Sequence, residues 1–317
     1  MIDATSVTIE NRNSKIENPP LSLPDLASWS FSGTALAVLG QPIKHSISPA
    51  MHNAALADMA AREPRFLDWR YFRFEIPPDA LADALRQLHA AGFHGINLTV
   101  PHKTLAFNCI DSIDTAARPA GAVNTLRRTP DGWEGFNTDG YGLAAAVRET
   151  LQCELSGMDI ILLGAGGAAR GAAVECAQRG CRSLAIANRT ASRRDELCSA
   201  VGALAPDLPL RSFDPAEPPR DLPRGALVIN ATSAGLKPDD PAPIDLTRLG
   251  RAAAVYDMIY NPPQTPLLRQ AAALDIPHAN GLSMLVHQGA RALEIWTGTS
   301  VPVDVMRAAA TAALNAH

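Results

Sequence analysis

The segment GINLTVPHK, residues 95–103, combines a strand pattern with polar side chains and a lysine. Side chains alternate between the two faces of a strand, so the apolar residues 96, 98 and 100 share one face, and Asn97 and Thr99 share the other. A half-exposed surface strand would explain this alternation. A strand that lines a binding cleft would explain it too, and the residues that follow the strand favour the cleft.

Lys103 comes two residues after Pro101, which predicts that the lysine lies in the first turn of a helix. The helix dipole opposes a positive charge at that end and favours loss of a proton. A lysine held in this way can act as a general acid or base. A carboxylate such as Asp139 could orient it. The alternative interpretation is an ordinary surface lysine.

Two serines follow the first predicted strand in the segment GQPIKHSISPAMHN, residues 40–53. Ligands of α/β proteins bind at the carboxyl ends of the strands, and neutral hydroxyls beside a helix start suit a carboxylate. Ser46 and Ser48 are therefore candidate substrate ligands. Ser48 could instead be a helix cap, with Pro49 at the first helical position. Asn124 and the segment 137–139 could likewise be turn or cap residues.

The segment LLGAGGAAR, residues 162–170, contains Gly164-x-Gly166-x-x-Ala169 directly between a predicted strand and a predicted helix. Small residues let the backbone turn tightly and approach a pyrophosphate, whose charge the helix N-terminus favours. The spacing to the end of the next strand is near the ~20 residues typical of a dinucleotide site. A tight turn without a ligand is the alternative.

The next strand ends in NRTASRR, residues 188–194, where an NAD site would place an acid. Arg189, Arg193 and Arg194 supply positive charge there, and Asn188 carries no charge to repel a phosphate. This pattern predicts a site for the 2′-phosphate of NADP. A solvated basic helix start is the alternative, but cations at a helix N-terminus are slightly unfavourable.

These residues require a scaffold of strands and helices in alternation, and the pattern from Ala35 onward predicts an α/β fold. Strands are expected at 35–40, 66–76, 95–100, 160–164, 183–188, 226–235 and 252–260, with a further short strand among loops at 206–224. Helices are expected at 48–62, 79–93, 102–110, 141–151, 165–180, 192–204, 264–275, 283–298 and 303–316, with Gly92 able to end the second.

Length, charge and cysteine usage narrow the class of protein. A chain of 317 residues favours two domains, and a net charge of −4 argues against a nucleic-acid partner. No apolar run approaches the ~20 residues that span a membrane. Five scattered cysteines without a CxxC pair argue against disulfides and zinc, and they favour a reducing cytoplasm. Residues 1–33 are polar and interrupted by prolines, so we expect a frayed extension.

Taken in order, the motifs resemble those of the shikimate dehydrogenase family. The resemblance runs from about residue 34 to residue 300, and it is carried by GQPIKHSISPAMHN, GINLTVPHK, GAVNT, GFNTDG, GAGGAAR, NRTASR, INATSAG, YDMIYNPPQTPLL and NGLSMLVHQGA. It implies a substrate domain at 34–138 plus 281–317, a Rossmann-type NADP domain at 139–280 and a polar extension at 1–33. The implied reaction is the NADPH-dependent reduction of 3-dehydroshikimate to shikimate, on the route to chorismate and the aromatic amino acids.

The resemblance also implies a role for each matching residue. Lys103 would donate and accept the proton, and Asp139 would bind the reacting hydroxyl beside it. The polar face of residues 96–100 would line the substrate cleft. The remaining substrate ligands would be Ser46, Ser48 and Tyr260 at the carboxylate and Thr99, Asn124 and Gln288 at the ring hydroxyls. The cofactor ligands would be Gly164, Ala165, Gly166, Gly167, Ala168, Asn188, Arg189, Thr190, Arg193, Met258 and Gly281, of which the last two would lie near the nicotinamide.

Two positions depart from the family pattern. His102 replaces an aromatic residue and could titrate beside Lys103, and Ser283 replaces a glycine. A quinate/shikimate paralogue that uses NAD is one alternative, although Asn188 with its arginines argues against it. An NADP-binding regulator without activity is another, although Lys103 and Asp139 are both present. The spacing of the histidine, cysteine and acidic residues does not support a metal site. A homodimer is a possible assembly that the sequence does not decide.

Overall fold

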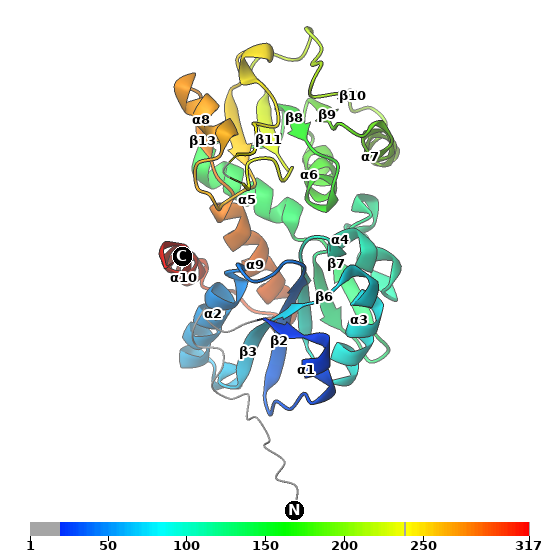
Figure 1. Cartoon of the computed structure of the whole chain (residues 1–317), viewed down its shortest axis with the longest axis vertical. Helices are drawn as coiled ribbons and strands as arrows, with labels where there is room; N and C mark the ends of the chain where they lie inside the picture. Colours follow the sequence, from blue (N-terminus) through cyan, green and yellow to red (C-terminus); the bar gives the residue numbers. More distant parts are fainter. Residues whose placement is uncertain (1–19, 238, 317) are drawn as a thin grey trace, which may run out of the picture. The chain divides into compact units, whose positions relative to one another are not determined.

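The computed structural model describes residues 20–237 and 239–316 (Figure 1). The chain divides into two compact units. The first unit contains residues 20–113, 124–136 and 292–316, and the second contains residues 114–123 and 137–291. The chain therefore contributes three segments to the first unit and two to the second. The predicted α/β class is confirmed in both units.

A mixed seven-stranded sheet forms the centre of the first unit, in the order β1-β3-β2-β4-β6-β7-β5. Its strands are β1 (Leu21–Ser22), β2 (Thr34–Gly40), β3 (Trp69–Glu75), β4 (Gly95–Leu98), β5 (Ser112–Ile113), β6 (Thr125–Arg128) and β7 (Trp133–Phe136). Strands β1 to β4 are parallel, and β6 is antiparallel to both β4 and β7. The carboxyl ends of β2 and β4 therefore meet the amino end of β6 at one edge of the sheet.

Helices cover the sheet of the first unit. They are α1 (Leu23–Ala27), α2 (Ser48–Arg62), α3 (Leu81–Ala90), α4 (His102–Leu105) and α10 (Val303–Asn315), with 3-10 turns η2 (Pro64–Phe66), η3 (Pro78–Ala80) and η4 (Ala106–Asn108). Helices α2 and α10 pack against each other (Figure 1). Gly92 follows α3 with a φ of 81°, a left-handed value that suits glycine, so the expected helix end is confirmed.

Residues 20–33 differ from the predicted frayed extension. Strand β1 pairs with the outer side of β3, and α1 follows it directly. The Trp29 ring lies 4.8 Å from the Phe93 ring and 5.0 Å from the Phe72 ring, and Phe31 also contacts Phe72. Aromatic burial therefore holds this segment on the sheet although its overall composition is polar. The expectation for residues 1–19 lies outside the described residues.

The second unit contains a sheet of six parallel strands, in the order β10-β9-β8-β11-β12-β13. The strands are β8 (Asp159–Leu163), β9 (Ser183–Ala187), β10 (Leu210–Phe213), β11 (Leu227–Asn230), β12 (Ala254–Asp257) and β13 (His278–Ala279). Counted within the unit, this is the order 3-2-1-4-5-6 of dinucleotide-binding folds. The order reverses between β8 and β11, where such folds bind their ligand.

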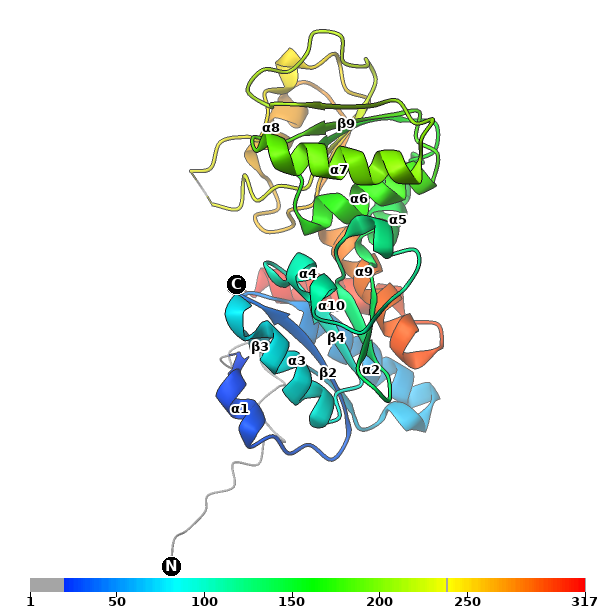
Figure 2. The same ribbon diagram turned by 90° about the vertical axis from the view of Figure 1, so that its right-hand side faces the viewer.

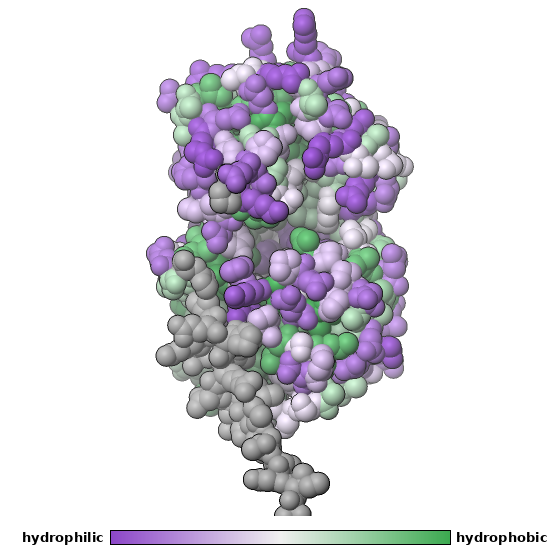
Figure 3. All heavy atoms as spheres, viewed as in Figure 1, coloured by the Kyte–Doolittle hydropathy of each residue, from purple (hydrophilic) through white to green (hydrophobic). Residues whose placement is uncertain are grey.

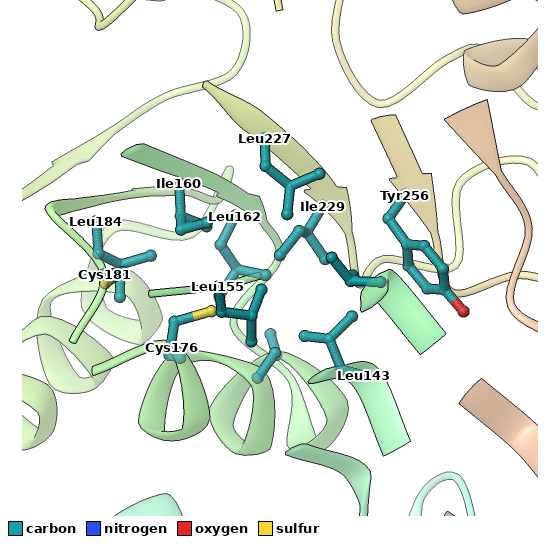
Figure 4. Packing of buried hydrophobic residues seen from close by; sticks show 14 of the residues in the cluster. Leu143, Leu155, Ile160, Leu162, Cys176, Cys181, Leu184, Leu227, Ile229 and Tyr256 are labelled. Atoms are coloured by element: carbon teal, nitrogen blue, oxygen red, sulfur yellow. The ribbon is translucent and has the colours of Figure 1, made fainter. Parts of the chain in front are cut away.

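Both faces of this second sheet are buried, as expected for parallel strands. Ile160 and Leu162 of β8 face α5 (Asp139–Leu151), α6 (Gly167–Gln178) and α7 (Ala191–Leu204), as Figure 4 shows for part of this cluster. Ile161 and Leu163 face the opposite layer, which includes α8 (Pro266–Ala273) and η6 (Leu246–Arg248). Figure 2 shows α5, α6 and α7 grouped on one side. The unit also holds η5 (Arg118–Ala120) and the start of α9 (Leu282–Thr297), which ends in the first unit.

Each predicted strand and helix has a counterpart, but the antiparallel pair β6–β7 was not predicted. The segment between these four-residue strands, TPDG at residues 129–132, has the residue types of a turn. The predicted helix at 102–110 is shorter than expected, because α4 ends at Leu105 and continues as a 3-10 turn. Short strands and short helices carry too few residues for a clear hydrophobic period.

Three further expectations concern the described residues as a whole. None of their helices has the length and apolarity needed to cross a membrane, and no group of acidic, histidine or cysteine side chains among them could hold a metal ion. All five cysteines lie in this part of the chain and are free thiols. Burial raises the pKa of the Cys181 thiol to about 11, which suits a packing role. Hydrophilic residues cover most of the surface drawn in Figure 3.

Candidate active site

The first unit brings five predicted substrate residues to one edge of its sheet. Ser46 and Ser48 follow β2, Thr99 and Lys103 follow β4, and Asn124 precedes β6. Backbone hydrogen bonds join the three segments: the Thr99 amide donates to Leu39 at 2.9 Å, and the Leu98 amide donates to Asn124 at 2.8 Å. Three hydroxyls, a carboxamide and a cation thus lie on neighbouring strand ends, where α/β sheets bind ligands.

The segment that contains Ser46 and Ser48 differs from one prediction about the start of the following helix. Helix α2 begins at Ser48 itself, its N-cap is Ile47, and no side chain caps it. The alternative in which Ser48 is the cap is therefore wrong. The Ser48 side chain is largely buried, with an exposed fraction of 9%, and the Ser48 amide donates to the Ser46 hydroxyl at 3.4 Å. This bond keeps the two hydroxyls in one turn at the start of α2.

His102 is fully buried next to half-buried Lys103. Its Nε2 lies 2.9 Å from the Ile76 carbonyl, to which a protonated Nε2 donates, and its Nδ1 has no hydrogen-bond partner among the described residues. Burial lowers the pKa of His102, while the bond to the carbonyl raises it by less. The ring is therefore neutral near pH 7. A buried, neutral ring fits a packing role better than titration beside Lys103.

Asn124 is 1% exposed and lies next to a buried carboxamide that sequence reasoning did not name as a site residue. Asn97 donates to the Asn124 carbonyl at 3.1 Å and to the Thr125 hydroxyl at 3.0 Å, and it accepts from the Tyr71 hydroxyl at 2.7 Å. The polar face of the strand at residue 97 is thus buried against β3 and β6. The signal was the asparagine inside a buried strand, which must find partners.

In the second unit, Asp139 is the first residue of α5 and is 3% exposed. Its amide donates to the Asn137 side chain at 3.0 Å, and Asn137 donates in turn to the Ala122 carbonyl at 2.9 Å. Asn137 is therefore the turn residue in this segment, and it sets the entry of the chain into α5. The arrangement fixes the backbone that carries the Asp139 carboxylate.

Gln288 lies on α9, which approaches α5 very closely. A Cβ added to Gly142 of α5 would lie 2.8 Å from the Gln288 Cβ and 2.9 Å from the Met284 carbonyl oxygen. Only glycine fits this crossing without movement of a helix. Nearby, Glu149 of α5 accepts a hydrogen bond from Ser283 and lies 3.1 Å from the His287 ring, both on α9. The departure at Ser283 thus adds a polar bond between the two helices.

The glycine turn follows β8, next to β11. Gly164 has a φ of 115°, and a Cβ there would lie 2.9 Å from the Ala231 carbonyl oxygen. Gly166 is the exposed N-cap of α6 and has no side-chain capping bond, and a Cβ there would meet nothing within 4 Å. The start of α6 is thus bordered by open space, and its first amides point outward without helical acceptors.

The arginines after β9 have two different roles. Arg194 donates to the Asn188 carbonyl at 2.8 Å and lies 4.0 Å from Asp214, so it supports the turn. Arg189 and Arg193 are exposed, and neither forms an ion pair with a described residue. The Asn188 carboxamide donates to the Thr190 carbonyl at 3.0 Å. The turn therefore presents two guanidinium groups and is itself held by a third.

Met258 and Gly281 lie in close contact. A Cβ at Gly281 would lie 2.0 Å from the Met258 carbonyl oxygen, so the position admits only glycine. Asp257, fully buried, accepts from Asn230 at 2.9 Å and from Thr265 at 2.7 Å, which ties the loops after β11 and β12 together. Burial raises the pKa of this carboxyl group, and the hydrogen bonds lower it by less. Sequence reasoning did not identify this network.

Tyr260 also belongs to the second unit, three residues after the end of β12. Its side chain is half-buried, and burial raises the pKa of its phenol. It is therefore a neutral hydrogen-bonding group at physiological pH. It can donate to a carboxylate, as its predicted role requires.

Three family models match the chain. Residues 38–126 match the shikimate dehydrogenase substrate binding domain, residues 145–234 match shikimate/quinate 5-dehydrogenase, and residues 281–311 match the shikimate 5′-dehydrogenase C-terminal domain. Together they span both units. Each matched segment contains residues that the sequence analysis assigned to substrate or cofactor.

Curated relatives are similar over nearly their whole length. The NADP(+)-dependent shikimate dehydrogenase of Geobacter sulfurreducens is 40% identical over 291 residues, which cover 90% of this chain and 99% of the relative. The enzyme of the same name from Methanopyrus kandleri is 39% identical over 280 residues, which cover 86% and 93%.

Solved structures share the fold. A shikimate dehydrogenase in complex with NADP+ has a TM-score of 0.78 at 32% identity, with 89% of this chain and 96% of that chain covered. The Thermus thermophilus enzyme in complex with NADP(H) and shikimate has a TM-score of 0.76 at 35% identity, covering 89% and 100%. The 5-ketofructose reductase of Gluconobacter has a TM-score of 0.77 at 32% identity, covering 89% and 99%. This chain belongs to the shikimate dehydrogenase family.

Proposed function

We propose that this protein is an NADP-dependent shikimate dehydrogenase, which interconverts 3-dehydroshikimate and shikimate. The observation that carries the proposal is the gathering of Ser46, Ser48, Thr99, Lys103 and Asn124 at one edge of the first sheet. This set matches a small carboxylate with several hydroxyls and one carbonyl to be protonated. A 5-ketofructose substrate has no carboxylate, so the serine pair favours shikimate over the activity of the Gluconobacter neighbour.

The two serine hydroxyls, supported by Tyr260, are proposed to hold the substrate carboxylate. Thr99, Asn124 and Gln288 are proposed to bind the ring hydroxyls. Uncharged donors suit this task because they can bind a carboxylate without adding charge to the reacting centre. These contacts select the ring and place its reacting carbon.

Lys103 is proposed to hold and move the proton. In the reduction its ammonium gives a proton to the carbonyl oxygen as that oxygen gains charge, and in the oxidation its amine takes the proton from the hydroxyl. Asp139 is proposed to accept a hydrogen bond from the same hydroxyl and to stabilise the charged lysine. Neutral His102 adds no second cation that would compete for this role.

The residues of the second unit fit NADP. The bare amides at the start of α6 and the open space at Gly166 suit a pyrophosphate, and Arg189 and Arg193 offer the paired charge that a 2′-phosphate requires. Met258 and Gly281 are proposed to border the nicotinamide, which supplies or accepts the hydride when the cofactor is bound. The substrate and cofactor roles are proposed to divide between residues 34–138 plus 281–317 and residues 139–280.

The test is a spectrophotometric assay of the purified protein at 340 nm with shikimate and quinate, each against NADP+ and NAD+. We expect the highest kcat/KM for shikimate with NADP+. A higher kcat/KM for quinate with NAD+ would favour the paralogue, and NADP+ binding without turnover of either acid would favour the inactive regulator. We propose that the enzyme acts in the cytoplasm, in the biosynthesis of aromatic compounds. Sedimentation velocity would distinguish a monomer from the proposed homodimer.

A further inference from the structure

A row of buried hydrogen bonds runs through the first unit from Tyr71 to Asn124. The Tyr71 hydroxyl lies 2.7 Å from Asn97 Oδ1, Asn97 Nδ2 lies 3.0 Å from the Thr125 hydroxyl, and that hydroxyl lies 3.1 Å from Asn124 Oδ1. All four side chains are at most 6% exposed. The row crosses β3, β4 and β6, with Asn97 directly opposite Thr125 in the β4–β6 register.

The direction of the row follows from one backbone group. The Asn124 carbonyl lies 3.1 Å from the Asn97 carboxamide, and a carbonyl can only accept a hydrogen bond. The atom of Asn97 that faces it must therefore be nitrogen. This nitrogen has two protons, and the second is directed to the Thr125 hydroxyl. The remaining oxygen of Asn97 accepts from Tyr71.

The same reasoning extends to the substrate residue. Thr125 accepts from Asn97, and its own hydroxyl donates to the Asn124 side-chain oxygen at 3.1 Å. A donor selects the oxygen end of a carboxamide. The Asn124 Oδ1 therefore faces the Thr125 hydroxyl, and its Nδ2 is directed away from that hydroxyl.

The far end of the row is held firmly. The His52 ring stacks on the Tyr71 ring at 4.1 Å with an interplanar angle of 13°, and its Nδ1 lies 2.9 Å from the Ser48 carbonyl. Burial raises the pKa of the Tyr71 phenol well above its usual value, so the hydroxyl keeps its proton and remains a donor. The row thus begins with a donor whose position is set by packing.

We infer that Tyr71, Asn97 and Thr125 are positioning residues that fix the Asn124 carboxamide with its NH2 group as a hydrogen-bond donor to the substrate. The inference rests on the proposed function, in which Asn124 binds a ring hydroxyl. This row of hydrogen bonds, or relay, would turn the NH2 end of Asn124 toward the ligand, so that the substrate oxygen accepts the hydrogen bond. A carboxamide free to turn would spend part of its time with its oxygen toward the ligand and would bind it less well.

Thr125→Val is the central test, because it keeps the side-chain shape and removes the hydroxyl. The KM for shikimate should rise about three- to tenfold, as expected for loss of one oriented hydrogen bond, while the KM for NADP+ stays within about twofold. Thr125→Ser retains the hydroxyl and should restore the KM. Thr297→Val is the matched control in the same unit: it removes a buried hydroxyl bond to Leu293, at 2.7 Å, that is not part of the relay. It should lower stability without raising the KM.

A double-mutant cycle separates positioning from general loss of structure. If Thr125 acts through Asn124, then Asn124→Ala and the double variant with Thr125→Val should have the same KM for shikimate. The inference would be overturned if Thr125→Val raised the KM for shikimate equally in the wild type and in Asn124→Ala. An unchanged KM in the single variant Thr125→Val would also overturn it. If Thr125→Val does not fold, Tyr71→Phe can be used instead, because it removes only the hydroxyl at the far end of the row. It should raise the KM for shikimate about twofold, and an unchanged KM would contradict the inference.

A measurement on the free protein keeps this inference distinct from the proposed function. The two side-chain amide protons of Asn97 donate to buried acceptors, so they should exchange with solvent far more slowly in NMR spectra than those of exposed Asn108. Exchange as fast as at Asn108 would overturn the relay whatever the enzyme does. Slow exchange in a protein that does not turn over shikimate would refute the function and support the relay.

Discussion

Gly142→Ala should damage both stability and substrate binding, because α5 and α9 cross at this glycine. The added Cβ would lie 2.8 Å from the Gln288 Cβ, whereas ordinary van der Waals contacts of a Cβ begin at 3.4 Å. Helix α9 must therefore retreat by at least 0.6 Å, the difference between the two distances. The other contacts, at 2.9 Å, are the Gln288 amide and the Met284 carbonyl, and main-chain atoms cannot rotate away.

Two effects on stability oppose each other in this variant. Alanine is favoured over glycine inside a helix by about 0.5–1 kcal/mol. Overpacking of a tight contact costs about 1–3 kcal/mol, so overpacking outweighs helix propensity. We expect net destabilisation of about 1–2 kcal/mol in urea unfolding monitored by circular dichroism.

The same displacement moves Gln288, a proposed substrate ligand. A misplacement of ~1 Å can reduce catalysis by ~10²-fold, so a shift of this size should lower kcat/KM for shikimate roughly tenfold. Gly202→Ala is the matched control, because its Cβ would lie 3.6 Å from the Leu210 Cδ1 in ordinary contact. That variant should be at least as stable as the wild type and equally active. If Gly142→Ala behaves like Gly202→Ala, the crossing is looser than the geometry indicates.

Four other predictions, on five variants, follow from the same structure. Lys103→Ala should reduce kcat by ~10²-fold or more with a smaller change in shikimate affinity by titration calorimetry, and near-normal turnover would exclude Lys103 as the acid–base group. Ser48→Ala should raise the KM for shikimate by about one to two decades with little effect on kcat, since a carboxylate contact contributes mostly uniform binding. Arg189→Ala and Arg193→Ala should each weaken the binding of NADP+ by about tenfold or more in fluorescence titrations and leave the binding of NAD+ unchanged. Equal losses of affinity for the two cofactors would mean that these arginines only support the turn. His102→Phe should reduce the loss of Tm between pH 7.5 and 5.5. Burial lowers the pKa of His102 in the folded state, so the unfolded chain binds the extra proton and the wild-type protein loses stability as the pH falls below the usual histidine pKa. The same dependence of Tm on pH in the variant and the wild type would contradict this.

Much of the fold could be predicted because each unit follows a simple hydrophobic pattern. The apolar run at 160–163 predicts a strand, which is confirmed, and in the structure Ile160 and Leu162 face one layer while Ile161 and Leu163 face the other. Glycine positions were equally informative, since Gly164 and Gly92 adopt the backbone conformations that their turns require. Strand and turn preferences of this kind depend on residues that are close together in the sequence, so they can be predicted from it.

The remaining features depend on partners far apart in the chain. Asn97 and Thr125 are opposite each other only because β4 pairs with β6, a strand that was not predicted. The role of Gly142 depends on α9, which begins 140 residues later, at Leu282. A helix cap was a reasonable interpretation of Ser48, but the chain begins the helix one residue earlier than that interpretation requires, and the N-cap is Ile47. Such contacts are tertiary and leave little trace in local sequence.

The docking of residues 20–33 has a consequence for how this chain can be shortened. Strand β1 pairs with the outer side of β3 at Phe74 and Glu75, so it covers backbone groups at that end of β3 that could otherwise pair with another molecule. Removal of the segment would leave that end of the edge open and would remove the Trp29 ring from its contacts with Phe72, Phe74 and Phe93. A chain that starts at residue 34 should therefore self-associate through its sheet edge. A chain that starts at residue 20 retains β1 and should not self-associate in this way.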